Sequence, residues 1–137
     1  MRQADLILVV DDNETGVLLV RTVLELEGFQ VDSAGSAQEV LERLRFRTPA
    51  LVLMDVQLPG QDGLSLTRQL KADPATAGIR IVALTAYAMA GDREQALAAG
   101  CIGYITKPID TRALGDQVRQ FLSTEPTEPV GEVPARP

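Results

Sequence analysis

Short apolar runs recur along the chain, and the segments between them carry apolar residues at helical spacing. The five runs are Leu6–Val10, Phe29–Ala34, Ala50–Met54, Ile79–Leu84 and Ile102–Ile105. Their length and their content of Val, Ile and Leu predict β-strands. Apolar residues three and four positions apart predict helices, most clearly within 16–24, 37–44 and 114–122. The chain therefore alternates strand and helix.

This alternation predicts the fold class. Strands joined through helices form parallel α/β sheets with helices on both faces. For a five-stranded sheet, the flavodoxin-like order 2-1-3-4-5 is the leading topology. Gly28 and Gly100 stand where a helix C-terminus favours glycine. Ser36 with Glu39 forms a capping-box pattern, and Asp110 is placed to cap the last helix.

The composition indicates one globular domain followed by a tail. The chain has 137 residues, 45% hydrophobic and 23% charged. With 4% aromatic residues and no Trp, its core must consist of aliphatic side chains, as in sheets covered on both faces. We expect the folded domain to span residues 1–122. Residues 123–137 contain four of the eight prolines and no apolar periodicity, which predicts a disordered tail or linker.

Charge and residue usage exclude several classes of function. A formal charge of -6 and scattered basic residues argue against direct binding of nucleic acid. Histidine is absent, which excludes Ser-His and Cys-His catalysis and any His-containing metal site. The single cysteine, Cys101, has apolar neighbours typical of a small buried residue. No apolar run reaches the roughly 18 residues of a membrane span, and the first residues do not resemble a signal peptide. We therefore expect a cytoplasmic protein.

Polar residues stand where the predicted strands end. Asp11 and Asp12 follow the first strand, Asp55 the third, Thr85 the fourth and Lys107 the fifth. Open parallel sheets bind ligands outside these ends, near the point where strand order reverses. Adjacent strands lie about 4.8 Å apart, so the predicted order brings the three carboxylates together. Each pair at roughly 5 Å costs on the order of 3 kcal/mol at an effective dielectric near 20, which favours a bound divalent cation.

Mg²⁺ suits these ligands best, because it accepts a few carboxylates, keeps several waters and completes its shell with phosphate oxygens. Lys107 adds an ammonium group and Thr85 a hydroxyl at the same cleft. This combination indicates a phosphoryl site. Asp55 is the best candidate nucleophile, because turn residues follow it and carboxylate attack on phosphorus yields an acyl phosphate. Mg²⁺ and Lys107 would offset charge on the transferring group.

Four segments, VVDDN, LMDVQLPGQDG, ALTAYA and YITKP, occur in this order at the strand ends. Together they resemble the receiver domain of two-component response regulators, over the range Leu6–Leu122. The resemblance implies that Asp55 receives a phosphoryl group from a histidine kinase or a histidine phosphotransfer protein. It implies that Asp12, Asp55 and the backbone carbonyl of Gln57 ligate Mg²⁺. Asp11 would assist through water.

The same resemblance implies that Lys107 pairs with the phosphoryl oxygens and that the bond to the following proline is cis. It also implies a switch, in which the Thr85 hydroxyl moves onto the phosphoryl group and Tyr104 turns inward. The face made by the fourth helix, fifth strand and fifth helix would then change shape and bind a downstream protein or a second copy. Such a domain catalyses its own phosphorylation and dephosphorylation. We hypothesise that Gln57 and Tyr87 influence how water reaches the acyl phosphate.

Simpler interpretations exist for single residues. Asp11 and Asp12 are also suited to cap the first helix. Lys107 is, on its own, as readily an ordinary surface lysine. A cap explains only one of the three acids. Thr85 is a common strand residue, and Tyr104 is as readily a packing aromatic as a switch. Asp62 is most simply a turn residue, and we assign it no chemistry.

The residues that follow the first strand argue against two other functions. A flavodoxin-like FMN carrier needs a Gly-, Ser- and Thr-rich phosphate loop there, whereas DDNETG would repel phosphate. A haloacid-type phosphatase places its Asp nucleophile on that strand with a second Asp two residues later, where this chain has Asn13. Two alternatives stay open: a receiver-shaped interaction module that works without phosphorylation, and a receiver fragment of a hybrid histidine kinase.

Overall fold

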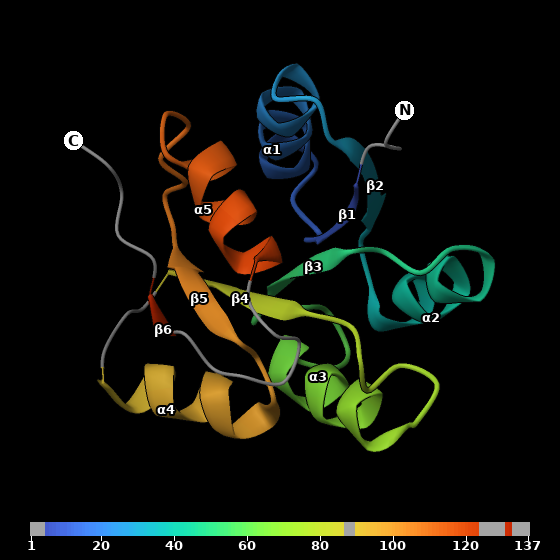
Figure 1. Ribbon diagram of the computed structural model, residues 1–137. Helices are drawn as coiled ribbons and strands as arrows, with labels where there is room; N and C mark the ends of the chain where they lie inside the picture. The colour runs from blue at the N-terminus through green and yellow to red at the C-terminus, as the bar shows by residue number, and fades with distance from the viewer. Residues whose placement is uncertain (1–4, 87–89, 124–130, 133–137) are drawn as a thin grey trace.

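The computed structural model describes residues 5–86, 90–123 and 131–132 (Figure 1). The helices and strands of these residues are β1 Leu6–Val10, α1 Glu14–Leu26, β2 Gln30–Ala34, α2 Ala37–Phe46, β3 Leu51–Asp55, α3 Gly63–Ala72, β4 Ile81–Thr85, α4 Ala90–Ala99, β5 Gly103–Thr106, α5 Leu114–Leu122 and β6 Gly131–Glu132. The five predicted strands are all present, with boundaries that shift by up to two residues. Strand and helix alternate as the sequence pattern predicted.

The strands form one parallel sheet in the order β2-β1-β3-β4-β5-β6. Its first five members have the predicted flavodoxin-like order. Pairing of Val10 with Met54 and of Asp55 with Leu84 aligns the carboxyl ends of β1, β3 and β4. Figure 1 shows α1 and α5 on one side of the sheet and α2, α3 and α4 on the other. The residues that follow β1, β3 and β4 therefore share one edge of the molecule.

Both faces of the sheet are covered by apolar side chains. On one face, residues of β1, β3, β4 and β5 pack against α1 and α5, with Leu24 and Phe121 fully buried. On the other face, Met54 and Tyr104 pack with residues of α2, α3 and α4. Because both faces are covered, every residue of β1, β3 and β4 is buried. The core is chiefly aliphatic, as the composition predicted, and Cys101 is buried within it.

Helix caps follow the sequence signals in most places. The Ser36 hydroxyl accepts a hydrogen bond from the Glu39 N–H at 3.3 Å and caps α2. Gly28 and Gly100 have φ of 95° and 111°, the left-handed conformation predicted for residues after a helix. The prediction that Asp110 caps the last helix was wrong. Its carboxylate accepts a hydrogen bond from the Arg112 N–H at 3.0 Å, in the turn before that helix. The helix α5 begins later, at Leu114, without a side-chain cap.

One strand was not predicted. Of residues 123–137, the structure describes Ser123, at the end of α5, and Gly131–Glu132, which pair with β5 as the short strand β6. The rest of the predicted disordered tail lies outside the described residues. Among the described helices, none is long and apolar enough to cross a bilayer.

Candidate functional site

Three carboxylates meet at the ends of the adjacent strands β1 and β3. One oxygen from each of Asp11, Asp12 and Asp55 lies within 4.8 Å of the other two. Asp11 and Asp55 are buried, with exposed fractions of 7% and 6%, whereas Asp12 is exposed. The predicted strand order thus brings these acids together. We refer to them, with Lys107, as the acid corner.

Lys107 directly follows β5, two strands away from β3, and its side chain reaches this cluster. Its Nζ donates to Asp11 Oδ2 at 3.0 Å and to Asp55 Oδ2 at 3.1 Å. Its backbone N–H donates to the Thr85 carbonyl at 2.7 Å, which ties the residue to the end of β4. The bond from Lys107 to Pro108 is cis, as the resemblance implied. An ordinary surface lysine is therefore the wrong interpretation of Lys107.

Backbone donors hold the remaining carboxylate oxygens. The Asn13 N–H donates to Asp11 Oδ1 at 3.0 Å, and the Gln57 N–H donates to Asp55 Oδ1 at 2.9 Å. Each buried acid is thus fixed at one oxygen by the backbone and at the other by Lys107. Such fixed positions are what metal binding and phosphoryl transfer require of a carboxylate.

The pKa values of the two buried acids are shifted in opposite directions. Burial raises the pKa of Asp55 above its ordinary value, and the nearby charge of Asp11 adds to this, although the Gln57 N–H and Lys107 act against it. For Asp11, burial also acts to raise the pKa, but hydrogen bonds from Asn13 and Lys107 outweigh it and hold the pKa low. Burial opposes the charge of Lys107, yet the two carboxylates raise its pKa. The Lys107 ammonium therefore stays charged, and ionisation is less favourable for Asp55 than for Asp11.

The helix cap at α1 is made by Asn13, not by either acid before it. Its side chain accepts from the Gly16 N–H at 2.9 Å. Capping by Asp11 or Asp12 was the main structural alternative for these residues, and it is wrong. Both carboxylates are consequently available to the acid corner.

A glycine that the sequence argument passed over shapes the other side of the site. Gly63 is the first residue of α3, and its N–H donates to the Val56 carbonyl at 3.0 Å. A Cβ at this position would lie 2.0 Å from the Asp55 carbonyl oxygen, closer than any side chain tolerates. Asp62, interpreted as a turn residue, caps α3 by accepting from the Ser65 N–H at 2.8 Å. The QDG sequence thus packs α3 directly against the end of β3.

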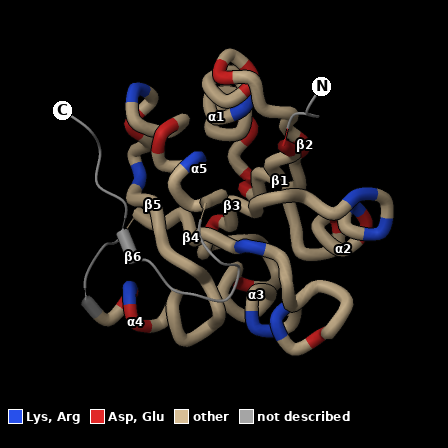
Figure 2. The backbone as a smooth tube through the Cα atoms, viewed as in Figure 1, with Lys and Arg blue, Asp and Glu red and all other residues tan. Residues whose placement is uncertain are grey.

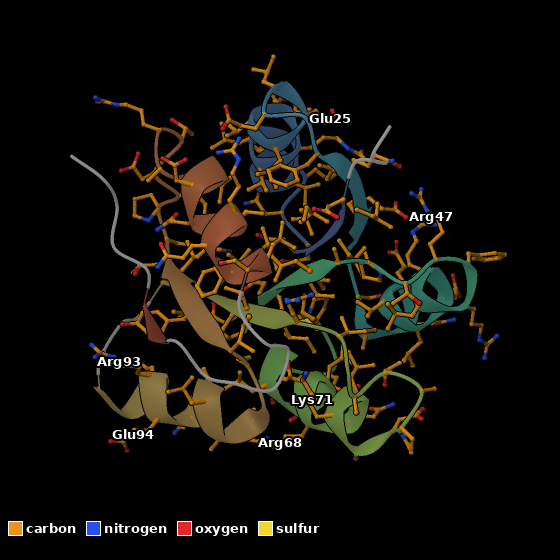
Figure 3. The ribbon with its side chains drawn as sticks, in the orientation of Figure 1. Glu25, Arg47, Arg68, Lys71, Arg93 and Glu94 are labelled. Atoms are coloured by element: carbon orange, nitrogen blue, oxygen red, sulfur yellow. The ribbon has the colours of Figure 1, made fainter. Side chains whose placement is uncertain are left out.

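The neighbouring strands β4 and β5 present neutral groups at the same edge. Thr85 and Tyr104 have exposed fractions of 6% and 1%, and both line a cavity of about 320 Å³ between α3 and α4. The Arg93 guanidinium lies over the Tyr104 ring, 5.5 Å from its centroid. Figure 3 shows Arg93 on α4. We call Thr85, Tyr104 and Arg93 the switch corner. No sequence pattern pointed to Arg93, and Tyr87 lies outside the described residues.

Comparison with known proteins decides the family. Residues 7–119 match the model of the response regulator receiver domain. The chain belongs to this family. It is 37% identical over 116 residues to the polar-differentiation response regulator DivK of Brucella ovis, a match that covers 85% of this chain and 94% of DivK.

Solved receiver structures share the fold. The signal receiver domain of a signal transduction histidine kinase from Syntrophus aciditrophicus is 32% identical with a TM-score of 0.79, covering 88% of this chain and 91% of that one. A response regulator from Thermotoga maritima is 29% identical with a TM-score of 0.80, covering 88% and 99%. The chain is thus a receiver of a two-component system, and Asp11, Asp12 and Asp55 form the acidic phosphorylation site of that family. Such a receiver implies a histidine kinase as its partner.

The donor set of this receiver fits a hard divalent cation. Three carboxylates and one ammonium leave the acid corner with a net formal charge of minus two. All available side-chain ligands are oxygens, and the exposed Asp12 keeps one side open to water, as Mg²⁺ requires. Away from the site, Lys and Arg are spread over several helices in Figure 2, as the sequence predicted.

Proposed function

We propose that Asp55 accepts a phosphoryl group in a Mg²⁺-dependent transfer from phosphohistidine on a histidine kinase or a histidine phosphotransfer protein. The observation that carries this is the contact of Lys107 Nζ with Asp55 Oδ2 at 3.1 Å inside a three-carboxylate cluster. Asp11 has the same contact with Lys107. Asp55 is favoured because β3 lies between β1 and β4, which places this acid between the other carboxylates and Thr85.

In the transfer, a carboxylate oxygen of Asp55 forms a bond to phosphorus while the bond from phosphorus to the histidine nitrogen breaks. Asp12, Asp55 and the backbone carbonyl of Gln57 would hold Mg²⁺, with Asp11 acting through water. The bound ion supplies positive charge for the phosphoryl oxygens. Lys107 supplies a second positive charge, exchanging its contact with Asp55 for one with the phosphoryl group.

The switch corner then transmits the change caused by phosphorylation to the surface of the domain. The Thr85 hydroxyl would move onto the phosphoryl group, and the cavity that Thr85 and Tyr104 line supports this by leaving room for movement. A phosphoryl group adds about -1.5 to -2 charges, enough to bias a two-state surface. The face of α4, β5 and α5 is the proposed contact for a downstream protein or a second copy. The domain also hydrolyses its own acyl phosphate, with Gln57 and Tyr87 controlling the access of water.

Two features bear on where and how this receiver works. Its one cysteine, Cys101, is a free and buried thiol, which supports a reducing, cytoplasmic setting. The similarity to the kinase-borne receiver of Syntrophus aciditrophicus supports a second arrangement, in which the domain is part of a hybrid histidine kinase. The chemistry proposed for Asp55 is the same in both arrangements.

Incubation with acetyl phosphate and Mg²⁺, followed by intact-protein mass spectrometry, tests the proposal. We expect the wild type to gain one phosphoryl group and to lose this gain when EDTA removes the metal. Asp55→Ala should show no gain. Asp32→Ala, on β2 outside the acid corner, should match the wild type. An unmodified wild type would support the phosphorylation-independent module instead. An undiminished gain in Asp55→Ala would show that another residue accepts the phosphoryl group.

A further inference from the structure

The outer edge of β5 is the place where the predicted five-stranded sheet ends. The edge strand of a sheet presents backbone N–H and C=O groups to which an extended peptide adds as a further strand. Here the chain's own residues Gly131–Glu132 take that place as β6. They pair in parallel with β5, Gly131 opposite Gly103 and Glu132 opposite Tyr104.

The order of the elements explains why β6 lies parallel to β5. After every earlier strand, a helix returns the chain to the amino ends of the strands, and the next strand begins there in parallel. The helix α5 returns the chain in the same way, and β6 follows it. Thus β5, α5 and β6 repeat the β-α-β unit that builds the rest of the sheet. A tethered strand also has an effective concentration in the millimolar range, which favours it over a free peptide.

The added strand stands next to the switch corner. Tyr104, the residue opposite Glu132, is the one whose ring lies beneath Arg93 and lines the cavity with Thr85. Figure 1 shows β6 beside β5, with α5 above it and α4 below it. Residues 131–132 therefore occupy the centre of the face that we propose for downstream contacts.

We propose that the outer edge of β5 is a strand-docking site for an extended peptide segment, and that residues 131–132 occupy this site in cis. A protein that reads the face of α4, β5 and α5 through an extended segment must displace β6. The tail is then an internal competitor of the partner. The regulatory part of this inference rests on the proposed function, whereas the pairing itself does not.

Hydrogen exchange of the unphosphorylated full chain tests the pairing, so its outcome is independent of whether Asp55 accepts phosphate. Gly131→Pro/Glu132→Pro removes both N–H groups of β6, including the one that faces β5. We expect the amides of the peptide spanning residues 103–106 to exchange at least about 10-fold faster in this variant. The control Ala135→Pro/Arg136→Pro adds the same residues beyond the pair and should exchange like the wild type. Equal exchange in all three proteins would overturn the proposal.

Two further measurements identify the occupant. A synthetic peptide of residues 124–137, added in trans to Gly131→Pro/Glu132→Pro, should restore slow exchange of residues 103–106, and should have no effect on the wild type. Failure to restore it would overturn the docking site. Protection in the wild type should not change on dilution. Protection lost on dilution would mean that a second copy supplies the strand, and would overturn occupation in cis.

Discussion

The acid corner and the switch corner lie side by side at one edge of the sheet, and they are built differently. At the acid corner, Asp11 and Asp55 are each held by a backbone N–H and by Lys107, at distances between 2.9 and 3.1 Å. At the switch corner, Tyr104 is held by packing and by the cation of Arg93, next to a cavity of about 320 Å³. The two buried acids are thus tied by charge-assisted hydrogen bonds to a lysine and to the backbone, whereas the Tyr104 ring lies against a guanidinium and a cavity.

This difference matches the roles that we propose, with phosphoryl transfer at the acid corner and readout at the switch corner. Phosphoryl transfer needs ligands that do not move, because positioning and electrostatics supply most of the catalysis. A switch needs groups that can move at low cost. Lys107 connects the two corners, since its ammonium binds the acids while its backbone N–H binds the Thr85 carbonyl. Substitutions at the two corners should therefore have unlike effects.

The largest effect is expected where packing fixes the acid corner. In Gly63→Ala, the new methyl group would meet the Asp55 carbonyl oxygen at 2.0 Å, so α3 must move away from β3. We expect the free energy of unfolding to fall by about 3 kcal/mol, measured by urea denaturation. Gly78→Ala is the matched control, because nothing lies within 4 Å of a Cβ there. Equal stability of the two variants would contradict the packing described for α3.

Next in size is the loss of the bridging cation. Lys107→Ala removes the only ammonium that the described residues bring to the acid corner. We expect phosphorylation by acetyl phosphate to slow by about 100-fold, as when one preorganised electrostatic group is removed. The exposed Arg112, in the turn after β5, gives the control Arg112→Ala, whose rate should not change. A Lys107→Ala rate within a few-fold of the wild type would place the transfer elsewhere.

A moderate effect of opposite sign is expected from Asp55→Asn. Burial raises the folded pKa of Asp55, so this residue's contribution to stability is present at low pH and is lost as the pH rises through the folded pKa. At pH 7 the ionised group is unfavourable, and without Mg²⁺ the variant should be more stable than the wild type by about 1 kcal/mol. The gap should close near pH 4, roughly the ordinary carboxyl pKa.

Thermal unfolding across this pH range measures both quantities. Mg²⁺ should stabilise the wild type more than Asp55→Asn, because the variant lacks one ligand charge. A variant less stable than the wild type at pH 7 without Mg²⁺ would mean that the bond to Lys107 outweighs burial and carboxylate repulsion.

The smallest effect belongs to the switch corner. Arg93→Ala removes a cation over the Tyr104 ring, an interaction worth about 0.5 kcal/mol at an exposed position. We expect a loss of stability of that size and an unchanged phosphorylation rate. The adjacent exposed residue gives the control Glu94→Ala, which should have no effect. A phosphorylation rate that fell with Arg93→Ala would show that the two corners are not separate.

The sequence predicted most of the sheet and the acid corner for the same physical reason. Strands covered on both faces appear as apolar runs, so an Asp at the end of a run, such as Asp55, stands out. Strand order then follows from the alternation with helices, and it places Asp11 beside Asp55. Lys107 was found in this way as well, because it directly follows β5.

What the sequence did not predict depends on contacts without a local pattern. Asp11, Asp12 and Asn13 are all able to cap a helix, and only the path of the chain after β1 selects Asn13. Gly63 looks like one more turn glycine until α3 is packed on β3. The strand β6 pairs through backbone groups, which leave no side-chain signature in a proline-rich tail.

The most direct test of the central claim is to locate the acyl phosphate. Borohydride reduction of the phosphorylated protein converts an aspartyl phosphate to homoserine, and peptide mass spectrometry then identifies the residue. The geometry of the acid corner predicts homoserine at Asp55 alone, in a yield that depends on Mg²⁺. Homoserine at Asp11 or Asp12, or a yield unchanged by removal of Mg²⁺, would contradict the account.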